Sequence, residues 1–228
     1  MTARDRILNK LRAARRPFPD AQPPPADYLP AVRVDDTAPD ALLERFTAEL
    51  EALEGEVFAV DSADAAREQV LSLLRAGAAR RVMSWHFKHI PVPRLYTAIQ
   101  QAGYTIDYPQ TRGDDRPERL ARLETAEIGL TGASVAIAGT GTLVIQTGKG
   151  MTRLPAILPP THIAVIRLRQ IIPRIEDWLA HQRRSDSPAL NDPANVCFVT
   201  GPSRTADIEK MLVLGVHGPK RVQVIVIR

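Results

Sequence analysis

Two short segments near the C-terminus carry the residue types that bind a small anion or move a proton. The first runs from Thr200 to Glu209 and directly follows an apolar strand. A glycine turn at Gly201 is expected to open a helix, whose first amide N–H groups would point outward beside the hydroxyls of Ser203 and Thr205. Arg204 can hold a carboxylate or phosphate through two parallel hydrogen bonds. This spacing predicts an anion-binding site.

The same segment also has an interpretation without a ligand. Ser203 can cap the predicted helix. Arg204 can then pair with Asp207 or Glu209 within that helix. A charge-assisted bond to arginine contributes about 1.5 to 3 kcal/mol to holding an anion, against about 0.3 to 1 kcal/mol for an exposed helix dipole. The partner of Arg204 therefore decides between the two interpretations.

The second segment is Gly215-Val216-His217-Gly218-Pro219, in which a histidine lies between glycines just before the last strand. Glycines on both sides permit a tight, open loop, and imidazole titrates near neutrality, so His217 suits a general acid/base or a hydrogen-bonding role. A purely structural turn is the alternative. The candidate catalytic residues are His217 and Glu209, with Gly215 and Gly218 as candidate ligand contacts.

Two further glycine loops can contact an anion. Thr140, Gly141 and Thr142 lie in a Gly-Thr-Gly-Thr loop that joins two apolar strands, although a hairpin turn explains the same spacing. A second loop from Gln146 to Arg153 offers Lys149 and Arg153. Neither loop matches a P-loop, because no Gly-Lys-Ser/Thr follows at the required spacing.

Three of the other four histidines are also candidates for ligand contacts. His86 and His89 follow a predicted strand that ends at Trp85. A metal site needs further ligands that the sequence does not supply, so we predict a surface loop and no metal site. His162 begins another strand after two prolines, and its ring can enter a cleft.

Composition places the chain among ordinary globular proteins, with 44% hydrophobic and 25% charged residues in a total of 228. No apolar run reaches the roughly 18 residues that span a bilayer, and the Arg-rich start lacks the apolar stretch of a secretion signal. We therefore expect a cytoplasmic protein without a membrane span. Cys197 is the only cysteine, so this chain cannot ligate an iron–sulfur cluster with the usual four thiolates, and any cluster belongs to a partner.

Much of the net charge of +4 comes from six basic residues before residue 17. We expect a solvated arm rather than nucleic-acid or membrane binding, and no aromatic residues alternate with these charges as stacking on bases would require. Ile7, Leu8 and Leu11 lie on one face of a helix predicted there, and six prolines from Pro17 to Pro30 indicate a linker. We expect a basic helix and Pro-rich linker over residues 1–30 and one α/β domain over residues 31–228.

Beyond residue 38, helical stripes alternate with short apolar strands. This alternation predicts right-handed crossovers and a mainly parallel sheet with helices on both faces, a three-layer α/β/α fold. Ligands in such folds sit at the carboxyl ends of the strands. Strands over residues 128–132, 135–138 and 142–146 follow one another too closely for helical crossovers, which predicts antiparallel ribbons there.

Several blocks in the C-terminal half resemble the lactate-utilisation protein C family, whose domain is called LUD. The blocks are Thr131-Gly132, Ala136-Ile137-Ala138, and residues 140–144 (TGTLV), 158–165 (LPPTHIAV), 201–209 (GPSRTADIE) and 212–219 (LVLGVHGP). The resemblance covers residues 128–228 most closely. It implies a fold like that of sugar-phosphate isomerases and CoA transferases, which agrees with the predicted layers.

The resemblance also implies a role in oxidising L-lactate to pyruvate beside iron–sulfur partner proteins, with no cofactor bound by this chain. One departure is that the family commonly has a glutamate immediately before Thr-Gly-Thr, where this chain has Gly139. A nucleophilic or general-base carboxylate is therefore missing at that position, which argues against a mechanism like that of CoA transferases.

Three functions follow as hypotheses. The first is a non-redox subunit or accessory protein of an iron–sulfur L-lactate oxidation system, which binds a small carboxylate or phosphate through Ser203, Arg204 and His217. The second is a stand-alone isomerase or transferase for a sugar phosphate or an acyl-CoA, which would need an acidic base such as Glu209. The third is a metabolite-sensing module whose basic N-terminal helix engages a partner or nucleic acid, an interaction that deleting residues 1–30 would abolish.

Overall fold

The computed structural model divides the chain into two compact units, Met1–Ala31 and Val32–Arg228. The residues that it describes are 2–14, 32–109, 116–184, 193–206 and 212–228. In the first unit, helix α1 spans Ala3–Ala14, and Ile7 and Leu11 on this helix are largely exposed. The predicted proline-rich linker lies outside the described residues.

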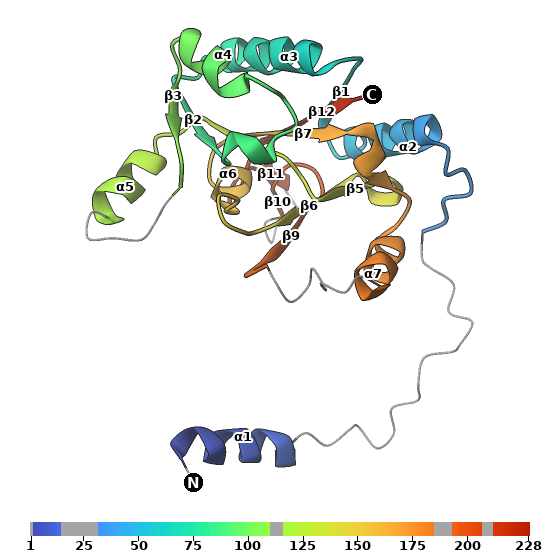
Figure 1. The fold of residues 1–228 in the computed structure, drawn as a ribbon, viewed down its shortest axis with the longest axis vertical. Coiled ribbons are helices and arrows are strands. Elements are labelled where there is room, and N and C mark those ends of the chain that lie inside the picture. Colours follow the sequence, from blue (N-terminus) through green and yellow to red (C-terminus); the bar gives the residue numbers. More distant parts are fainter. Residues whose placement is uncertain (1, 15–31, 110–115, 185–192, 207–211) are drawn as a thin grey trace. The chain divides into compact units, whose positions relative to one another are not determined.

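A six-stranded parallel sheet forms the centre of the second unit (Figure 1). Its strands run in the order β1-β12-β7-β4-β2-β3, and every neighbouring pair is parallel. The strands are β1 Glu56–Val60, β2 Arg81–Ser84, β3 Thr105–Asp107, β4 Ile128–Thr131, β7 Thr161–Arg167 and β12 Arg221–Ile227. The buried strands β4, β7 and β12 read as nearly continuous apolar runs because both faces of the sheet are covered.

Helices pack on both faces of this sheet, so the predicted α/β class with a mainly parallel sheet is confirmed. Helix α3 contacts β1 and β12 on one face, and helix α6 contacts β4, β7 and β2 on the other (Figure 1). Leu154 of α6 packs against Met83, Leu123 and Ala126. The helices of this unit are α2 Pro39–Glu51, α3 Ala63–Ala76, α4 Leu95–Gln101, α5 Arg116–Leu123, α6 Leu154–Ile157 and α7 Ile175–Arg184.

A second sheet of four strands lies below the central one in Figure 1, in the order β8-β5-β6-β9. Its strands are β5 Val135–Ile137, β6 Thr142–Gln146, β8 Ile171–Ile172 and β9 Val196–Val199. The predicted antiparallel ribbon is confirmed for β5 and β6. It is wrong for β4, which lies between β2 and β7 in the parallel sheet. Three residues, Gly132 to Ser134, are enough for the chain to leave one sheet and enter the other.

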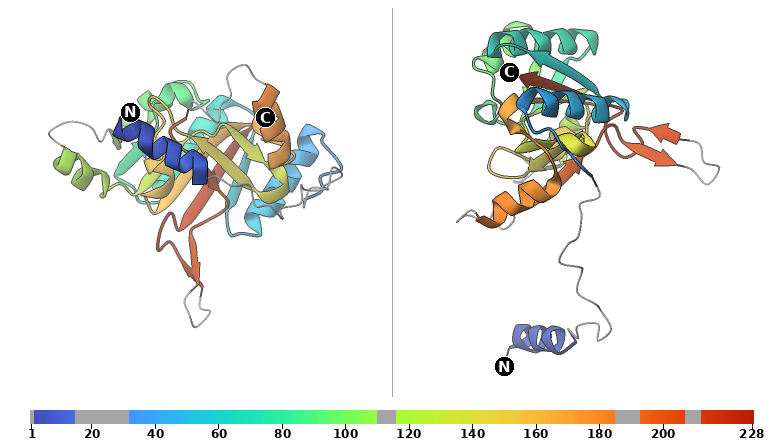
Figure 2. Two further views of the ribbon diagram at one scale, coloured as in Figure 1. Left: turned by 90° about the horizontal axis from the view of Figure 1, so that it is seen from below. Right: turned by 90° about the vertical axis from the view of Figure 1, so that its right-hand side faces the viewer.

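The segment after β9 forms a hairpin in place of the predicted helix. Strands β10 (Arg204–Ala206) and β11 (Leu212–Leu214) pair antiparallel and project from the body of the second unit (Figure 2). Because β9 belongs to the second sheet, the rule that a helix follows each parallel strand does not apply to it. The prediction of a helix after Gly201 is therefore wrong.

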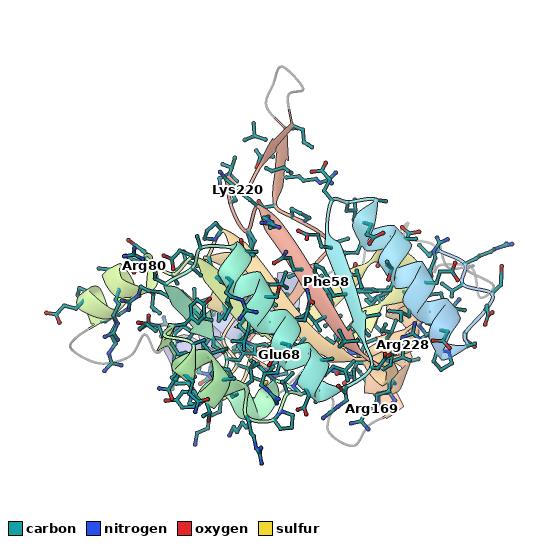
Figure 3. The ribbon with its side chains drawn as sticks, turned by 90° about the horizontal axis from the view of Figure 1, so that it is seen from above. Phe58, Glu68, Arg80, Arg169, Lys220 and Arg228 are labelled. Carbon is teal, nitrogen blue, oxygen red and sulfur yellow. The ribbon has the colours of Figure 1, made fainter. Side chains whose placement is uncertain are left out.

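The central sheet has two distinct edges. In Figure 3, Lys220 marks the beginning of β12 and Arg228 follows its end. The β10–β11 hairpin projects beyond Lys220, on the amino edge of the sheet. Arg169 lies with Arg228 at the opposite, carboxyl edge. Ligand sites in parallel α/β sheets form at the carboxyl edge, which makes the hairpin an unusual position for one.

Candidate functional site

The predicted anion-site residues gather at the base of the β10–β11 hairpin. The Ser203 amide donates to the Pro219 carbonyl at 2.8 Å, and the Gly215 amide donates to the Ser203 carbonyl at 2.8 Å. A Cβ added to Gly218 would lie 3.1 Å from the Cβ of Ser203. The two predicted segments therefore do come together, but the amides of Ser203 and Gly215 are already used in bonds that hold the loop to the hairpin.

The guanidinium of Arg204 has a carboxylate partner that neither interpretation of the sequence anticipated. Its Nη2 lies 3.5 Å from Oε1 of Glu54, which precedes β1. Glu209 lies outside the described residues, and His217 is exposed. Thr205 faces Val213 across the hairpin. Ligand binding by the hairpin residues, Gly201 included, stays a prediction.

The Gly-Thr-Gly-Thr loop joins β5 to β6 and packs against helix α2. A Cβ on Gly141, whose φ is 59°, would lie 2.6 Å from the backbone nitrogen of Leu50. The hydroxyls of Thr140, Thr142 and Thr200 form a chain in which both oxygen–oxygen distances are 2.8 Å. These three hydroxyls satisfy one another, as expected for a structural turn.

Gly139 lies in equally crowded surroundings. A Cβ at this position would lie 2.7 Å from Cγ1 of Val32 and 3.2 Å from the Pro173 carbonyl oxygen. A glutamate at this position would therefore require these neighbours to move. The packing around Gly139 therefore leaves no room for a glutamate side chain.

A different site lies at the carboxyl edge of the central sheet, where β2 and β3 end. It is a cavity of about 140 Å³. We call it the small cavity, and its lining residues are Ser84, His86, Tyr108, Pro109, Lys149, Gly150 and Thr152. Lys149 and Gly150 belong to the second glycine loop that the sequence singled out. His86 belongs to the segment that we predicted to be a surface loop.

Two hydroxyl groups of the small cavity can still bond to a ligand. The buried Ser84 hydroxyl donates to the Trp85 carbonyl at 2.7 Å, so it can only accept a bond from a ligand. The buried Oγ1 of Thr152 has no partner among the described residues. An unsatisfied buried hydroxyl costs about 1 to 3 kcal/mol. The lining residues include one cationic residue, Lys149, and no acidic residue, so the cavity favours an anion with hydrogen-bonding groups.

Two hydrogen bonds hold the glycine loop over the cavity. The indole Nε1–H of Trp85 donates to the Thr152 carbonyl at 2.7 Å. The His86 amide donates to the Gly150 carbonyl at 2.9 Å. Gly150 has φ 81°, and a Cβ there would lie 2.6 Å from the imidazole Cδ2 of His86. Only glycine allows the backbone to approach the imidazole this closely.

Tyr108 supplies the aromatic wall of the small cavity and a hydroxyl. Burial raises the pKa of the Tyr108 phenol, and the neighbouring Tyr96 adds to this shift. The phenol therefore keeps its proton throughout the physiological pH range and can donate a hydrogen bond. Together with Lys149 and Thr152, it gives the cavity three groups able to donate to a carboxylate.

Sequence reasoning missed Ser84, Tyr108 and Thr152. The first ends a strand of the parallel sheet and the second follows one. The rule that ligands sit at carboxyl ends of parallel strands points to both positions, provided that these strands are known to be neighbours. Thr152 carries no comparable signal, because it reaches the cavity only through the fold of the glycine loop.

His162 lies in the core rather than in a cleft. Its side chain is fully buried, with Nε2 at 2.8 Å from Oγ1 of Thr131 and with no partner for Nδ1 among the described residues. Burial lowers the pKa of the imidazole to about 4, so the ring is neutral at neutral pH. The prediction that this ring enters a cleft is wrong.

In the part of the chain that the structure describes, no group of three or more His, Cys, Asp or Glu side chains is placed to hold a metal ion. Cys197 is half-buried, and burial raises the pKa of its thiol. Within the same residues, no helix combines the length and the apolar character needed to cross a membrane.

Comparison with known proteins finds a family model that matches most of this chain. The LUD domain model matches residues 43–227. A lactate utilization protein C of Halalkalibacterium halodurans is 30% identical over 164 residues, which cover 72% of this chain and 70% of that protein. Proteins of the same name from Geobacillus sp. and Bacillus subtilis are 38% and 33% identical over 46% and 50% of this chain. The matched segments span only 43% and 48% of those two relatives.

A solved structure shares the fold. The crystal structure of a DUF162 family protein from Deinococcus radiodurans superimposes with a TM-score of 0.60. The alignment covers 85% of this chain and 100% of that protein, at 21% sequence identity. At this identity, the likeness shows that the two proteins share a fold.

Proposed function

Because this chain belongs to the LUD domain family, we propose that it serves lactate utilisation as a non-redox component that binds a small carboxylate. The relatives named lactate utilization protein C support the role. Oxidation of a hydroxy acid to a keto acid releases two electrons, which need a carrier. Because this chain has a single cysteine, it cannot hold an iron–sulfur cluster with four thiolates of its own, which supports a non-redox role. In this proposal, the carrier is an iron–sulfur cluster of a partner protein.

The observation that carries the proposal is the chemistry of the small cavity. An engineered cavity of about 150 Å³ in another protein binds benzene, which has as many non-hydrogen atoms as lactate. The cavity of about 140 Å³ is therefore a close match in size for a three-carbon acid. Larger substrates such as a sugar phosphate or an acyl-CoA do not fit inside it.

The polar groups of the cavity also match a 2-hydroxy acid. The Lys149 ammonium and the Thr152 and Tyr108 hydroxyls can donate to a carboxylate. The oxygen of Ser84 can accept a bond from the 2-hydroxyl group of the acid, since the Ser84 proton is already given to Trp85. This acceptor favours lactate over pyruvate, which has no hydroxyl proton to donate.

A titration of the purified full-length chain with L-lactate, pyruvate and acetate tests the site, with heat of binding as the readout. We expect L-lactate to bind most tightly, and Lys149→Met to raise its Kd by about tenfold or more, because a charge-assisted bond is lost. Arg204→Ala is the matched control, since it removes a cation at the opposite edge of the sheet. Loss of binding in Arg204→Ala but not in Lys149→Met would place the ligand at the hairpin instead.

The proposed partnership has its own test. The tagged chain should co-purify with iron–sulfur proteins from cells grown on lactate, and its deletion should slow growth on lactate. Normal growth on lactate after deletion, together with the absence of any iron–sulfur protein from the purified material, would contradict the proposed role. Binding of lactate to the isolated chain is measured separately, so the two parts of the proposal can fail independently.

A further inference from the structure

A second and larger opening lies beside the small cavity, on the same edge of the sheet. It has a volume of about 650 Å³, which is within the range of small-molecule sites. We call it the cationic groove. It is lined by residues 87–96 after β2, by Ala133 after β4, by Arg167 at the end of β7, and by Arg169 and Gln170 after that strand.

The position of the groove follows from the topology of the sheet. The chain leaves β2 toward α4 and β3, and it leaves β4 toward the second sheet on the other face (Figure 1). Neighbouring parallel strands whose connections run to opposite faces leave a crevice at their carboxyl ends. The groove occupies this crevice, and Figure 3 shows Arg169 at the same edge.

The charged residues that line the groove are all cationic. Its lining includes four exposed cationic side chains and no carboxylate: Lys88, Arg94, Arg167 and Arg169. In the described part of the chain, no ion pair involves any of these four. Arginines on other surfaces, such as Arg67, Arg174 and Arg228, do pair with carboxylates. Four uncompensated cations around one opening attract a ligand with several negative charges.

Aromatic and apolar side chains form the rest of the lining. Phe87 and Tyr96 meet edge to face, with ring centroids 5.4 Å apart. Tyr96 is 40% exposed and therefore offers part of its ring to a ligand. Ile90, Val92 and Leu95 are buried beneath. A flat apolar group can stack here while anionic groups reach the cations.

From this combination of charge, aromatic surface and size, we propose that the cationic groove binds a nucleotide. The phosphates would contact Arg167, Arg169 and Lys88, and the base would lie against Tyr96. Inorganic phosphate would leave the aromatic surface unused. The site is separate from the small cavity, so the inference does not depend on the proposed carboxylate.

The two openings share one wall. His86 lines the small cavity, whereas Phe87 to His89 line the cationic groove. The His89 Nε2 lies 3.1 Å from the carbonyl oxygen of Lys149, a residue that lines the small cavity. A nucleotide in the groove would therefore contact the segment that supports the carboxylate site.

Titration calorimetry with the full-length chain tests the inference, using ATP, inorganic pyrophosphate and hexaglutamate as probes. We expect ATP to bind more tightly than pyrophosphate, and the double variant Arg167→Gln/Arg169→Gln to raise the Kd for ATP by on the order of 100-fold, since two charge-assisted contacts are lost. Tyr96→Ala should weaken the binding of ATP but leave the binding of pyrophosphate unchanged. Lys149→Met, which tests the small cavity, should leave ATP binding intact.

Arg75→Gln/Arg80→Gln is the matched control, because both arginines are exposed and Arg80 precedes β2 at the amino edge. Equal losses in the two double variants would show attraction to net charge and overturn the proposal. Pyrophosphate binding as tightly as ATP would exclude recognition of the base. Tighter binding of hexaglutamate than of ATP would assign the groove to an acidic protein segment instead.

Discussion

The imidazole of His86 lies flat against the phenol ring of Tyr108, with ring centroids 4.5 Å apart and ring planes inclined by 8°. These residues lie 22 positions apart in the sequence, and each closely follows the end of one of two neighbouring strands, β2 and β3. The stack therefore exists only because the parallel sheet brings the two strand ends together. Both residues line the small cavity.

Two substitutions of Tyr108 distinguish the contribution of the stacked ring from that of the hydroxyl group. Tyr108→Phe keeps the ring and should raise the Kd for L-lactate by about three- to tenfold, the effect of one neutral hydrogen bond. Its free energy of unfolding should stay close to that of the wild type. Tyr108→Ala removes the ring as well and should lower both affinity and stability. Calorimetry and urea unfolding measure the two quantities, and an unchanged Kd in Tyr108→Phe would remove the hydroxyl from the site.

The buried imidazole of His162 should make stability depend on pH. The folded state holds this ring neutral, with a pKa of about 4 against the ordinary 6.5. Between these values the unfolded chain binds a proton that the folded chain does not, so stability falls as the pH drops from about 6.5 to 4. The loss is on the order of 3 kcal/mol at the lower end.

Urea unfolding of the wild type and of His162→Gln across this pH range measures that contribution. The variant has no titrating ring at this position, so its stability should fall less steeply than that of the wild type. Carboxylates contribute the same slope to both proteins and cancel in the comparison. Parallel pH profiles would show that His162 is protonated in the folded state.

The turn between β5 and β6 should tolerate nothing larger than glycine at position 141. Gly141→Ala adds a Cβ against the backbone of Leu50 and also places alanine at a positive φ. Overpacking and the left-handed conformation together should cost about 2 to 4 kcal/mol. Gly103→Ala is the control, because φ is 87° there with nothing within 4 Å of the added Cβ. Its cost should be about 1 kcal/mol, and equal losses in both variants would contradict the proposed crowding.

Asp107 should contribute to stability through a partly buried ion pair. Its carboxylate accepts hydrogen bonds from Nε and Nη2 of Arg81, at 3.1 and 2.6 Å, and also lies 3.2 Å from Nε of Arg122. Asp107→Asn removes the charge and leaves Arg81 unpaired, at a cost on the order of 2 kcal/mol. Arg122→Gln should cost less than about 0.5 kcal/mol, because that side chain is 58% exposed. Thermal unfolding distinguishes the two variants.

Much of the fold could be predicted from local patterns. The stripe of Leu42, Leu43, Phe46 and Leu50 marks helix α2, and the apolar run from Val222 to Ile227 marks the central strand β12. Such periodicities depend on residues close together in the sequence. The pairing of strands depends instead on residues far apart in the sequence, which explains why β4 was assigned to a ribbon and the β10–β11 hairpin to a helix.

By itself, the sequence determined the α/β class, the family, the glycine loop carrying Lys149 and the lack of thiolates for a cluster, because these depend on composition and short motifs. Only the tertiary structure decided that Arg204 meets Glu54 and that His86 meets Tyr108. Both contacts join residues far apart along the chain, and their geometry depends on the order and direction of strands in the sheet. A cavity is built from such long-range contacts, so its lining becomes known only when the strands are placed.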